Sequence, residues 1–188
     1  YQDSFYIDVH PVTNSEYHVF LEAKRLPKRH HRRDSSDAEW GSRPVTRVTW
    51  AEAQAYAKWA LKRLPTESEW EKSARGIDGR RWPWGSDEPT ADHADLGQED
   101  GPPAPVHHHP QGVSPYGVHN MAGGVWEWCE DQYDQFFYPR SPPRNPQCVD
   151  GDHRYRVARG GANTYSAFTA RCSYRGWNLP HMRSAAYG

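Results

Sequence analysis

The sequence predicts an α+β domain, with helices in its first half and short strands in its second. Three capping boxes, each a Thr followed three residues later by Glu, predict helices that begin at Thr13, Thr49 and Thr66. The 15 Gly and 16 Pro of the chain indicate many turns and long loops. A length of 188 residues fits one domain that buries most of its apolar surface.

Each predicted helix starts at its capping box, because the Thr oxygen can accept a hydrogen bond from an amide that the first helical turn leaves free. Apolar residues at helical spacing then define the face that packs inward. In the first helix these residues are Tyr17, Phe20 and Leu21, and in the second they are Trp50, Ala53, Ala57, Ala60 and Leu61. The third helix is expected to end at Gly76, a residue type favoured at that position.

Beyond the third helix the pattern changes to loops and then to strands. Residues 82–115 are rich in Pro, Gly, Asp and His, which predicts long loops. From Asn120 onward, short strand-like pieces alternate with turns: GVWEWC, YRVARGG and TARCSYRG. The first two pieces are separated by a predicted loop insertion, FFYPRSPPRNPQCVDGDHR.

Charge and cysteine content exclude several classes of function. The formal net charge of −1 gives no basis for binding nucleic acid or an anionic membrane surface. No apolar run is long enough for a membrane span. The three cysteines, Cys129, Cys148 and Cys172, have no C-x-x-C spacing and cannot form a disulfide framework. We therefore expect a reduced cytoplasmic protein whose partner is neither nucleic acid nor membrane.

Six segments, in their order and spacing, resemble the formylglycine-generating enzyme family, also called sulfatase-modifying factors. The motifs RLPTESEWE and NMAGGVWEW carry most of the specificity, and the resemblance covers nearly the whole chain. The matching segments are 5–23, 43–76, 82–89, 116–131, 155–161 and 172–188. The resemblance implies a single domain over residues 1–188 with a C-type-lectin-like fold that is irregular and loop-rich.

The same resemblance bears on catalysis. In the oxidases of this family a serine and two cysteines follow Arg-Gly-Gly, and the two thiolates bind Cu(I), which prefers soft ligands. The matching positions here are Ala162, Tyr165 and Ala170, while Cys172 matches a structural cysteine of the family. One cysteine cannot supply the pair, so we expect no copper and no oxidase activity.

The family also implies two structural calcium sites, and oxygen donors of the kind found here suit Ca²⁺. The first site would use four donors around a Gly-Gly turn: the Asn120 amide oxygen, the Gly123 and Val125 carbonyls and the Glu127 carboxylate. The second would use Asp95, the Leu96 carbonyl, Asp100 and the Pro102 carbonyl, with Asp95 where the family usually has Asn. The alternative at the first site is a simple turn followed by an exposed Glu.

The final segment, residues 159–188, interleaves two kinds of position. Expected frame residues are Arg159, Gly160, Gly161, Arg171, Cys172, Arg175, Pro180, Arg183 and Gly188. Predicted ligand-binding residues are Asn163, Tyr165, Ser166, Phe168, Thr169, Trp177, Asn178, His181 and Met182. The second set is rich in Tyr, Trp, Asn and Ser, which supply rigid aromatic area and adaptable hydrogen bonds in recognition surfaces. The competing interpretation is that one of its three large aromatic residues belongs to the core.

This interleaving resembles the variable region of proteins diversified by retroelements. We therefore predict a non-catalytic ligand-binding domain, the variable protein of a diversity-generating retroelement, which displays residues 159–188 to a protein or other ligand. Two alternatives stay open. One is a formylglycine-generating-type or sulfoxide-synthase-like enzyme, with Trp126, Arg159 and Arg175 lining a substrate cleft. The other is a sensor domain attached to a kinase.

Overall fold

The structure, a computed structural model, describes residues 1–28, 30–31 and 36–188. It confirms the α+β class, with the elements α1 (Asn14–Ala23), α2 (Trp50–Trp59), α3 (Glu67–Arg75), β1 (Glu127–Tyr133), β2 (Asp152–Arg159) and β3 (Gly176–Asn178) in chain order. Short 3-10 helices cover Trp40–Ser42, Pro110–Gly112 and Tyr138–Arg140. No helix within the described ranges has both the length and the apolar character needed to cross a membrane.

The three helices begin where their capping boxes predict. Each of Thr13, Thr49 and Thr66 accepts a hydrogen bond through its side-chain oxygen from the amide three residues later, and the Glu there accepts one from the Thr amide. α1 buries its predicted apolar stripe, whereas α2 fully buries only Ala57 of its stripe. Leu61 is exposed, because it lies beyond the end of α2 with a left-handed φ of 59°.

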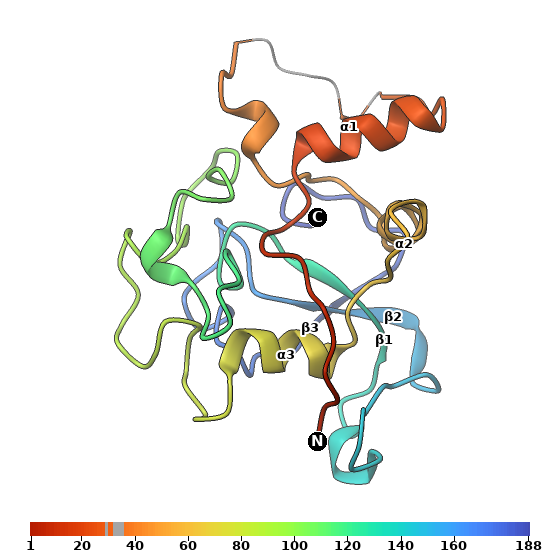
Figure 1. The fold of residues 1–188 in the computed structure, drawn as a ribbon, viewed down its shortest axis with the longest axis vertical. Coiled ribbons are helices and arrows are strands. Elements are labelled where there is room, and N and C mark those ends of the chain that lie inside the picture. Colours follow the sequence, from red (N-terminus) through yellow and green to blue (C-terminus); the bar gives the residue numbers. More distant parts are fainter. Residues whose placement is uncertain (29, 32–35) are drawn as a thin grey trace.

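Strands β1, β2 and β3 (Figure 1) form an antiparallel sheet in that order, and a hydrophobic cluster packs on each of its faces. Trp177 on β3 lies opposite Val157 on β2, and residues directly opposite share one face of the sheet. On that face Val157 belongs to a cluster with Trp70 of α3. On the other face Ala158 belongs to a cluster with Trp126. Neighbouring residues of β2 and β3 therefore point into different parts of the molecule.

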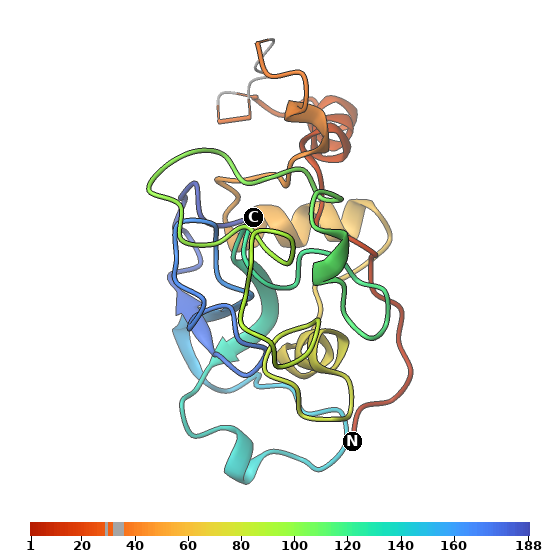
Figure 2. The same cartoon turned by 90° about the vertical axis from the view of Figure 1, so that its left-hand side faces the viewer.

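α1 lies at one end of the molecule in both views (Figures 1 and 2). The long connection from α3 to β1 consists mostly of loops, as its Pro and Gly content predicts, and faces the viewer in Figure 2. Backbone hydrogen bonds tie this connection to the final segment, from Gly97 N to Tyr165 O and from Gln98 N to Asn163 O, both 2.9 Å. The loops therefore support the segment that carries most of the predicted ligand-binding residues.

Candidate functional site

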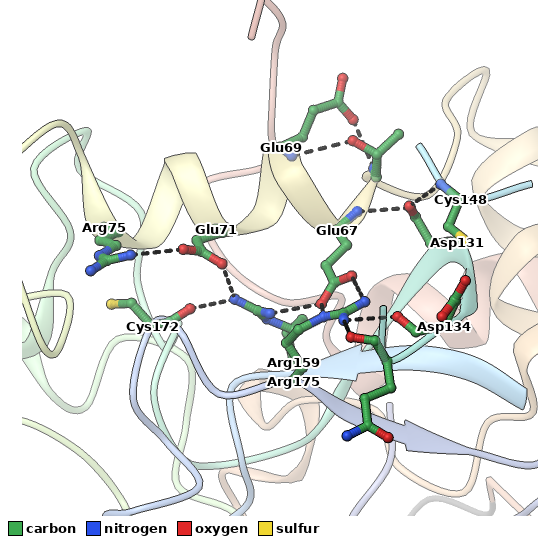
Figure 3. Close-up of polar contacts among 12 residues, drawn as sticks. Glu67, Glu69, Glu71, Arg75, Asp131, Asp134, Cys148, Arg159, Cys172 and Arg175 are labelled. Carbon is green, nitrogen blue, oxygen red and sulfur yellow. Dashed lines mark hydrogen bonds and ion pairs between the residues drawn. The ribbon is translucent and has the colours of Figure 1, made fainter. Parts of the chain in front are cut away.

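The frame of the final segment starts at Arg159, the last residue of β2. Its fully buried guanidinium binds two carboxylates of α3, at 2.8 Å from Nη1 to Glu67 Oε1 and 2.7 Å from Nη2 to Glu71 Oε2 (Figure 3). Nη2 also donates to the carbonyl oxygen of Cys172. A buried charge is tolerated only when it is paired and hydrogen-bonded in this way. Arg159 therefore joins β2, α3 and the chain at Cys172.

A second arginine, Arg175, binds the same carboxylate of Glu67. Its Nε and Nη2 atoms lie 2.8 Å from the two carboxylate oxygens, which gives a bidentate contact. The Glu67 amide in turn donates to Asp131 Oδ2 at 2.8 Å, at the start of α3 (Figure 3). Burial raises the pKa of Asp131 to about 6. Arg159 and Arg175 together fix both ends of residues 159–175 to α3.

The enzymatic alternative requires Trp126, Arg159 and Arg175 to line a substrate cleft. Trp126 is 3% exposed and Arg159 is fully buried. Arg175 is partly exposed but is held by its ion pair with Glu67. Two of the three side chains are therefore closed to a substrate in this structure.

The chain leaves β2 through a tight Gly-Gly turn. Gly160 and Gly161 have φ values of 95° and 75°, in the left-handed region that favours glycine. A β-carbon at Gly161 would also lie only 3.2 Å from the Ala170 amide nitrogen. Ala162 and Ala170 are themselves fully buried. These small residues hold the following turn closely against the core.

The turn formed by residues 163–169 presents two large aromatic side chains. Tyr165 is 40% exposed and Phe168 is 56% exposed. Each rests edge to face on a deeper ring, Tyr165 on Trp126 with centroids 5.6 Å apart and Phe168 on Tyr174 with centroids 5.5 Å apart. Such contacts position a ring while leaving part of its surface open.

The smaller predicted ligand-binding residues differ in exposure. Ser166 and His181 are exposed, whereas Thr169, Asn178 and Met182 are half-buried. The Thr169 hydroxyl donates to the carbonyl oxygen of Ser166 at 2.9 Å, and the Asn178 side-chain oxygen accepts from the next amide at 2.8 Å. Ser166 and His181 are thus the most accessible of these five.

Asn163 lies in the interior, although the sequence placed it among the ligand-binding residues. It is 2% exposed, and its side-chain amide donates to the Gly101 carbonyl at 3.0 Å. Its backbone accepts from Gln98 and donates to the Gly124 carbonyl. Asn163 therefore supports the neighbouring loops. Residue type alone could not reveal this, because Asn serves equally in loops and in recognition surfaces.

Trp177 points away from the aromatic residues of the turn. A β-carbon on its neighbour Gly176 would lie 2.5 Å from the Trp126 ring, and successive strand residues face opposite ways. On the opposite face, Trp177 contacts Tyr155 and Tyr133, with ring centroids 4.5 and 5.7 Å away. Trp177 is 46% exposed. The residues predicted as one ligand surface are therefore divided between two faces of the sheet.

The first implied calcium site contains two buried oxygen atoms that lack a hydrogen-bond partner among the described residues, Asn120 Oδ1 and Glu127 Oε1. The other oxygen of Glu127 accepts a hydrogen bond from the Trp70 indole at 3.2 Å. Burial raises the pKa of the Glu127 carboxyl to about 8. A carboxylate shielded in this way needs a cation or a proton to balance its charge.

Two backbone carbonyls lie beside the neighbouring Gly160 turn. A β-carbon on Gly160 would lie 3.6 Å from the Met121 carbonyl oxygen and 3.7 Å from that of Val125. The Gly123 amide donates to the Gly160 carbonyl at 2.8 Å, which joins the turn to the end of β2. Carbonyl, amide and carboxylate oxygens together suit Ca²⁺, so the residues fit this ion. The Met121 carbonyl was not among the donors expected from the sequence, because any residue type can supply a carbonyl.

The residues of the second implied calcium site do not fit an ion. Both carboxylate oxygens of Asp95 already accept hydrogen bonds, one from the Ala104 amide at 2.8 Å and one from the Gln98 side chain. Asp100 is exposed, and its carboxylate accepts from the amide of the following residue. The loop is thus closed by its own hydrogen bonds. In the described ranges, no group of three or more His, Cys, Asp or Glu side chains is arranged to hold a metal.

The three cysteines are buried and free. Burial raises the pKa of Cys172 to about 12, and its side chain packs in the cluster beside α3. Tyr165 and Ala170, at the positions of the copper-binding cysteines of the family, contribute an exposed phenol and a buried methyl group. Cys172 thus serves as a frame residue through its packing and its carbonyl bond to Arg159.

Comparison with known sequences matches the chain to one family and to two relatives that are longer proteins. The model of the family described as "Sulfatase-modifying factor enzyme 1-like domain" matches residues 2–188. The hercynine oxygenase of Mycolicibacterium smegmatis is 42% identical over 159 residues, which cover 79% of this chain and 37% of that protein. The serine/threonine-protein kinase pkn1 of Chlamydia caviae is 36% identical over 207 residues, which cover 98% of this chain and 32% of that protein. The chain thus spans about a third of the length of these relatives.

Comparison with solved structures identifies the fold. PvdO from Pseudomonas aeruginosa superposes with a TM-score of 0.79 at 21% identity, covering 95% of this chain and 76% of that one. Treponema denticola variable protein 1 superposes with a TM-score of 0.75 at 23% identity, covering 95% and 80%. These matches confirm the C-type-lectin-like fold of the formylglycine-generating-enzyme type.

Proposed function

The chain belongs to the sulfatase-modifying factor enzyme 1-like domain family, and we propose that it acts as a non-catalytic ligand-binding domain. One observation carries the proposal. The turn of residues 163–169 is anchored through backbone hydrogen bonds, including Gly97 N to Tyr165 O and Asn163 N to Gly124 O. Bonds of this kind do not depend on which side chain each position carries. The turn can therefore hold its shape while its exposed side chains serve recognition.

A protein surface is the ligand that suits the exposed side chains best. Tyr165 and Phe168 offer aromatic area that is already held in place by deeper rings. Ser166 beside them is an exposed hydroxyl. Rigid aromatics with small polar neighbours bind proteins at a low cost in conformational entropy. We propose that these three residues form the centre of the ligand contact.

We further propose that the domain is the variable protein of a diversity-generating retroelement. The shared fold with a protein titled variable protein 1 supports this at the level of the scaffold. Sequencing the gene from many isolates of its source population tests the assignment. We expect substitutions concentrated at the exposed positions Tyr165, Ser166 and Phe168, with Arg159 and Asn163 constant. Uniform sequence across isolates, or substitutions spread evenly over exposed and buried positions, would contradict it.

Ca²⁺ is proposed as a structural cofactor at the first site. Asn120, Glu127 and the carbonyls of Met121, Gly123 and Val125 would hold it, and its charge would balance the shielded Glu127 carboxylate. The second site is left out of the proposal, because Asp95 is already satisfied. The buried, free thiols agree with a reducing compartment such as the cytoplasm.

A second candidate function is that of the C-type-lectin-like part of a longer oxygenase. The 42% identity with a hercynine oxygenase over most of this chain favours it. An assay of the complete gene product for oxidation of hercynine distinguishes the two. We expect no oxidation of hercynine. Oxidation that depends on this domain would contradict the proposal of a non-catalytic ligand-binding domain. Cu(I)-dependent oxidation of a cysteine peptide would likewise restore the oxidase interpretation.

A further inference from the structure

The face of the sheet that carries Trp177 has an open pocket of about 260 Å³. Its lining residues are Tyr133, Asp134, Gln135, Asp152, Tyr155 and Trp177. We propose that this pocket binds an organic cation, an ammonium or guanidinium group. The inference rests on the proposed function only in treating Trp177 as a ligand-binding residue. It names the class of ligand that would bind at the face of the sheet carrying Trp177.

The aromatic walls of the pocket suit a positive charge. The Trp177 ring is inclined by 63° to Tyr155 and by 40° to Tyr133, so the three rings form an angled corner and not a closed stack. The face of an aromatic ring carries negative potential and attracts ammonium and guanidinium groups. A cation in this corner would contact more than one ring.

Two of the three rings already bind cations within the protein. The Arg154 guanidinium lies 5.5 Å from the centroid of the Tyr155 ring, and that of Arg175 lies 5.2 Å from the centroid of Tyr133. None of the cation–π pairs found in the described chain involves Trp177. Trp is the side chain that binds cations best in this way. The exposed ring of Trp177 is therefore available to bind a ligand cation.

The charge of the lining also favours a cationic ligand, because the lining includes two carboxylates and no cationic side chain. The amide of Phe136 and the side chain of Arg140 lower the pKa of Asp134. Arg154 lowers the pKa of Asp152 to about 2. Both groups are therefore ionised at neutral pH. The side chains of Arg140 and Arg154 are 57% and 68% exposed, and exposed ion pairs are weak enough for a ligand cation to compete.

The pocket is small, which limits the ligand to one headgroup. Pockets for drug-sized molecules measure roughly 300–1,000 Å³, more than the volume found here. A methylated ammonium group or the tip of one basic side chain fits this size. Both sources share the same chemistry, and the test below separates them.

Choline and its neutral isostere 3,3-dimethyl-1-butanol provide the matched probe, with indole signals of the whole chain followed by NMR at constant ionic strength. We expect choline to bind at least about fivefold more tightly than the alcohol, because only choline carries the charge. N-acetyl-arginine amide and N-acetyl-lysine amide form the second arm. Tighter binding of choline identifies an alkylammonium ligand, and tighter binding of an amide identifies a basic side chain of a protein.

Variants then locate the site. Trp177→Ala should weaken cation binding at least about fivefold and Trp177→Phe less, since the ring face is partly retained. Tyr116→Ala is the control, because Tyr116 is an exposed aromatic residue outside the pocket lining, and it should leave binding unchanged. Equal binding of choline and the alcohol, or no effect of Trp177→Ala, would overturn the inference. Either result leaves the proposed surface around Tyr165 and Phe168 untouched, because these probes do not report on it.

Discussion

Arg159 and Tyr165 lie six residues apart in the chain and are held in opposite ways. The Arg159 side chain is fully buried and is fixed by ion pairs to Glu67 and Glu71. Tyr165 is 40% exposed, and what fixes its position in the loop is its backbone carbonyl, which accepts from Gly97. The difference shows how this domain combines a fixed frame with a changeable surface: side chains hold the frame, and the backbone holds the turn.

The largest expected effect is at the frame. Arg159→Met leaves Glu71 and the Cys172 carbonyl without their buried partner, so we expect a loss of about 3–5 kcal/mol in the free energy of unfolding. Urea denaturation measures it. Arg154→Met is the matched control on the same strand, because its ion pair is exposed and should contribute about 1 kcal/mol or less. Similar losses in the two variants would remove the distinction between frame and surface.

Calcium should have the next largest effect, because the first site lies beside the Gly160 turn that leads into the displayed residues. At a free concentration of 100 times Kd, a bound ion stabilises by about 2.7 kcal/mol. We therefore expect EGTA to lower Tm by about 5–10 °C in a chain of this size. Glu127→Gln should abolish the response, whereas Asp100→Asn, in the second implied site, should retain it. An unchanged Tm with EGTA would contradict the assignment of Ca²⁺.

The pH dependence of stability tests whether the Glu127 carboxyl is shielded. In calcium-free buffer the folded-state pKa of Glu127 is raised to about 8, so the folded protein keeps a proton that the unfolded chain releases above about pH 4.5. Stability should therefore fall as pH rises from about 5 to 8, by about 3–4 kcal/mol. Glu127→Gln should remove this part of the slope, and so should saturating Ca²⁺. Equal slopes in both proteins would show that Glu127 is not shielded.

The smallest effect on stability is expected at the display surface. Tyr165→Ala and Phe168→Ala should each change the free energy of unfolding by about 1 kcal/mol or less, because both side chains are partly exposed and the turn is held by its backbone. Differential scanning calorimetry measures the change. A loss as large as that of Arg159→Met would instead mark these rings as core residues.

Local signals in the sequence predicted local structure well. The capping boxes at Thr13, Thr49 and Thr66 set the starts of all three helices, because the bonds that form them span only three residues. The α+β class followed from the change of pattern after Gly76. The buried partners of Arg159 could not be found in this way, since Glu67 lies 92 residues earlier in the chain.

The candidate site was predicted less completely. Tyr165, Phe168 and Trp177 are exposed, as expected of ligand-binding residues, but their division between two faces depends on the register of β3 against β2. That register is set by contacts such as Gly176 against Trp126, which no short motif encodes. The interior position of Asn163 has the same origin, because its partner Gly101 belongs to a distant loop.

Tolerance to randomisation tests the central claim most directly. One library would randomise the exposed positions Tyr165, Ser166, Phe168 and Trp177, and a second would randomise the buried positions Ala162, Asn163, Ala170 and Cys172, with resistance to protease as the measure of folding. We predict that most members of the first library stay folded and that few members of the second do. Equal losses in the two libraries would contradict the account of a changeable surface on a fixed frame.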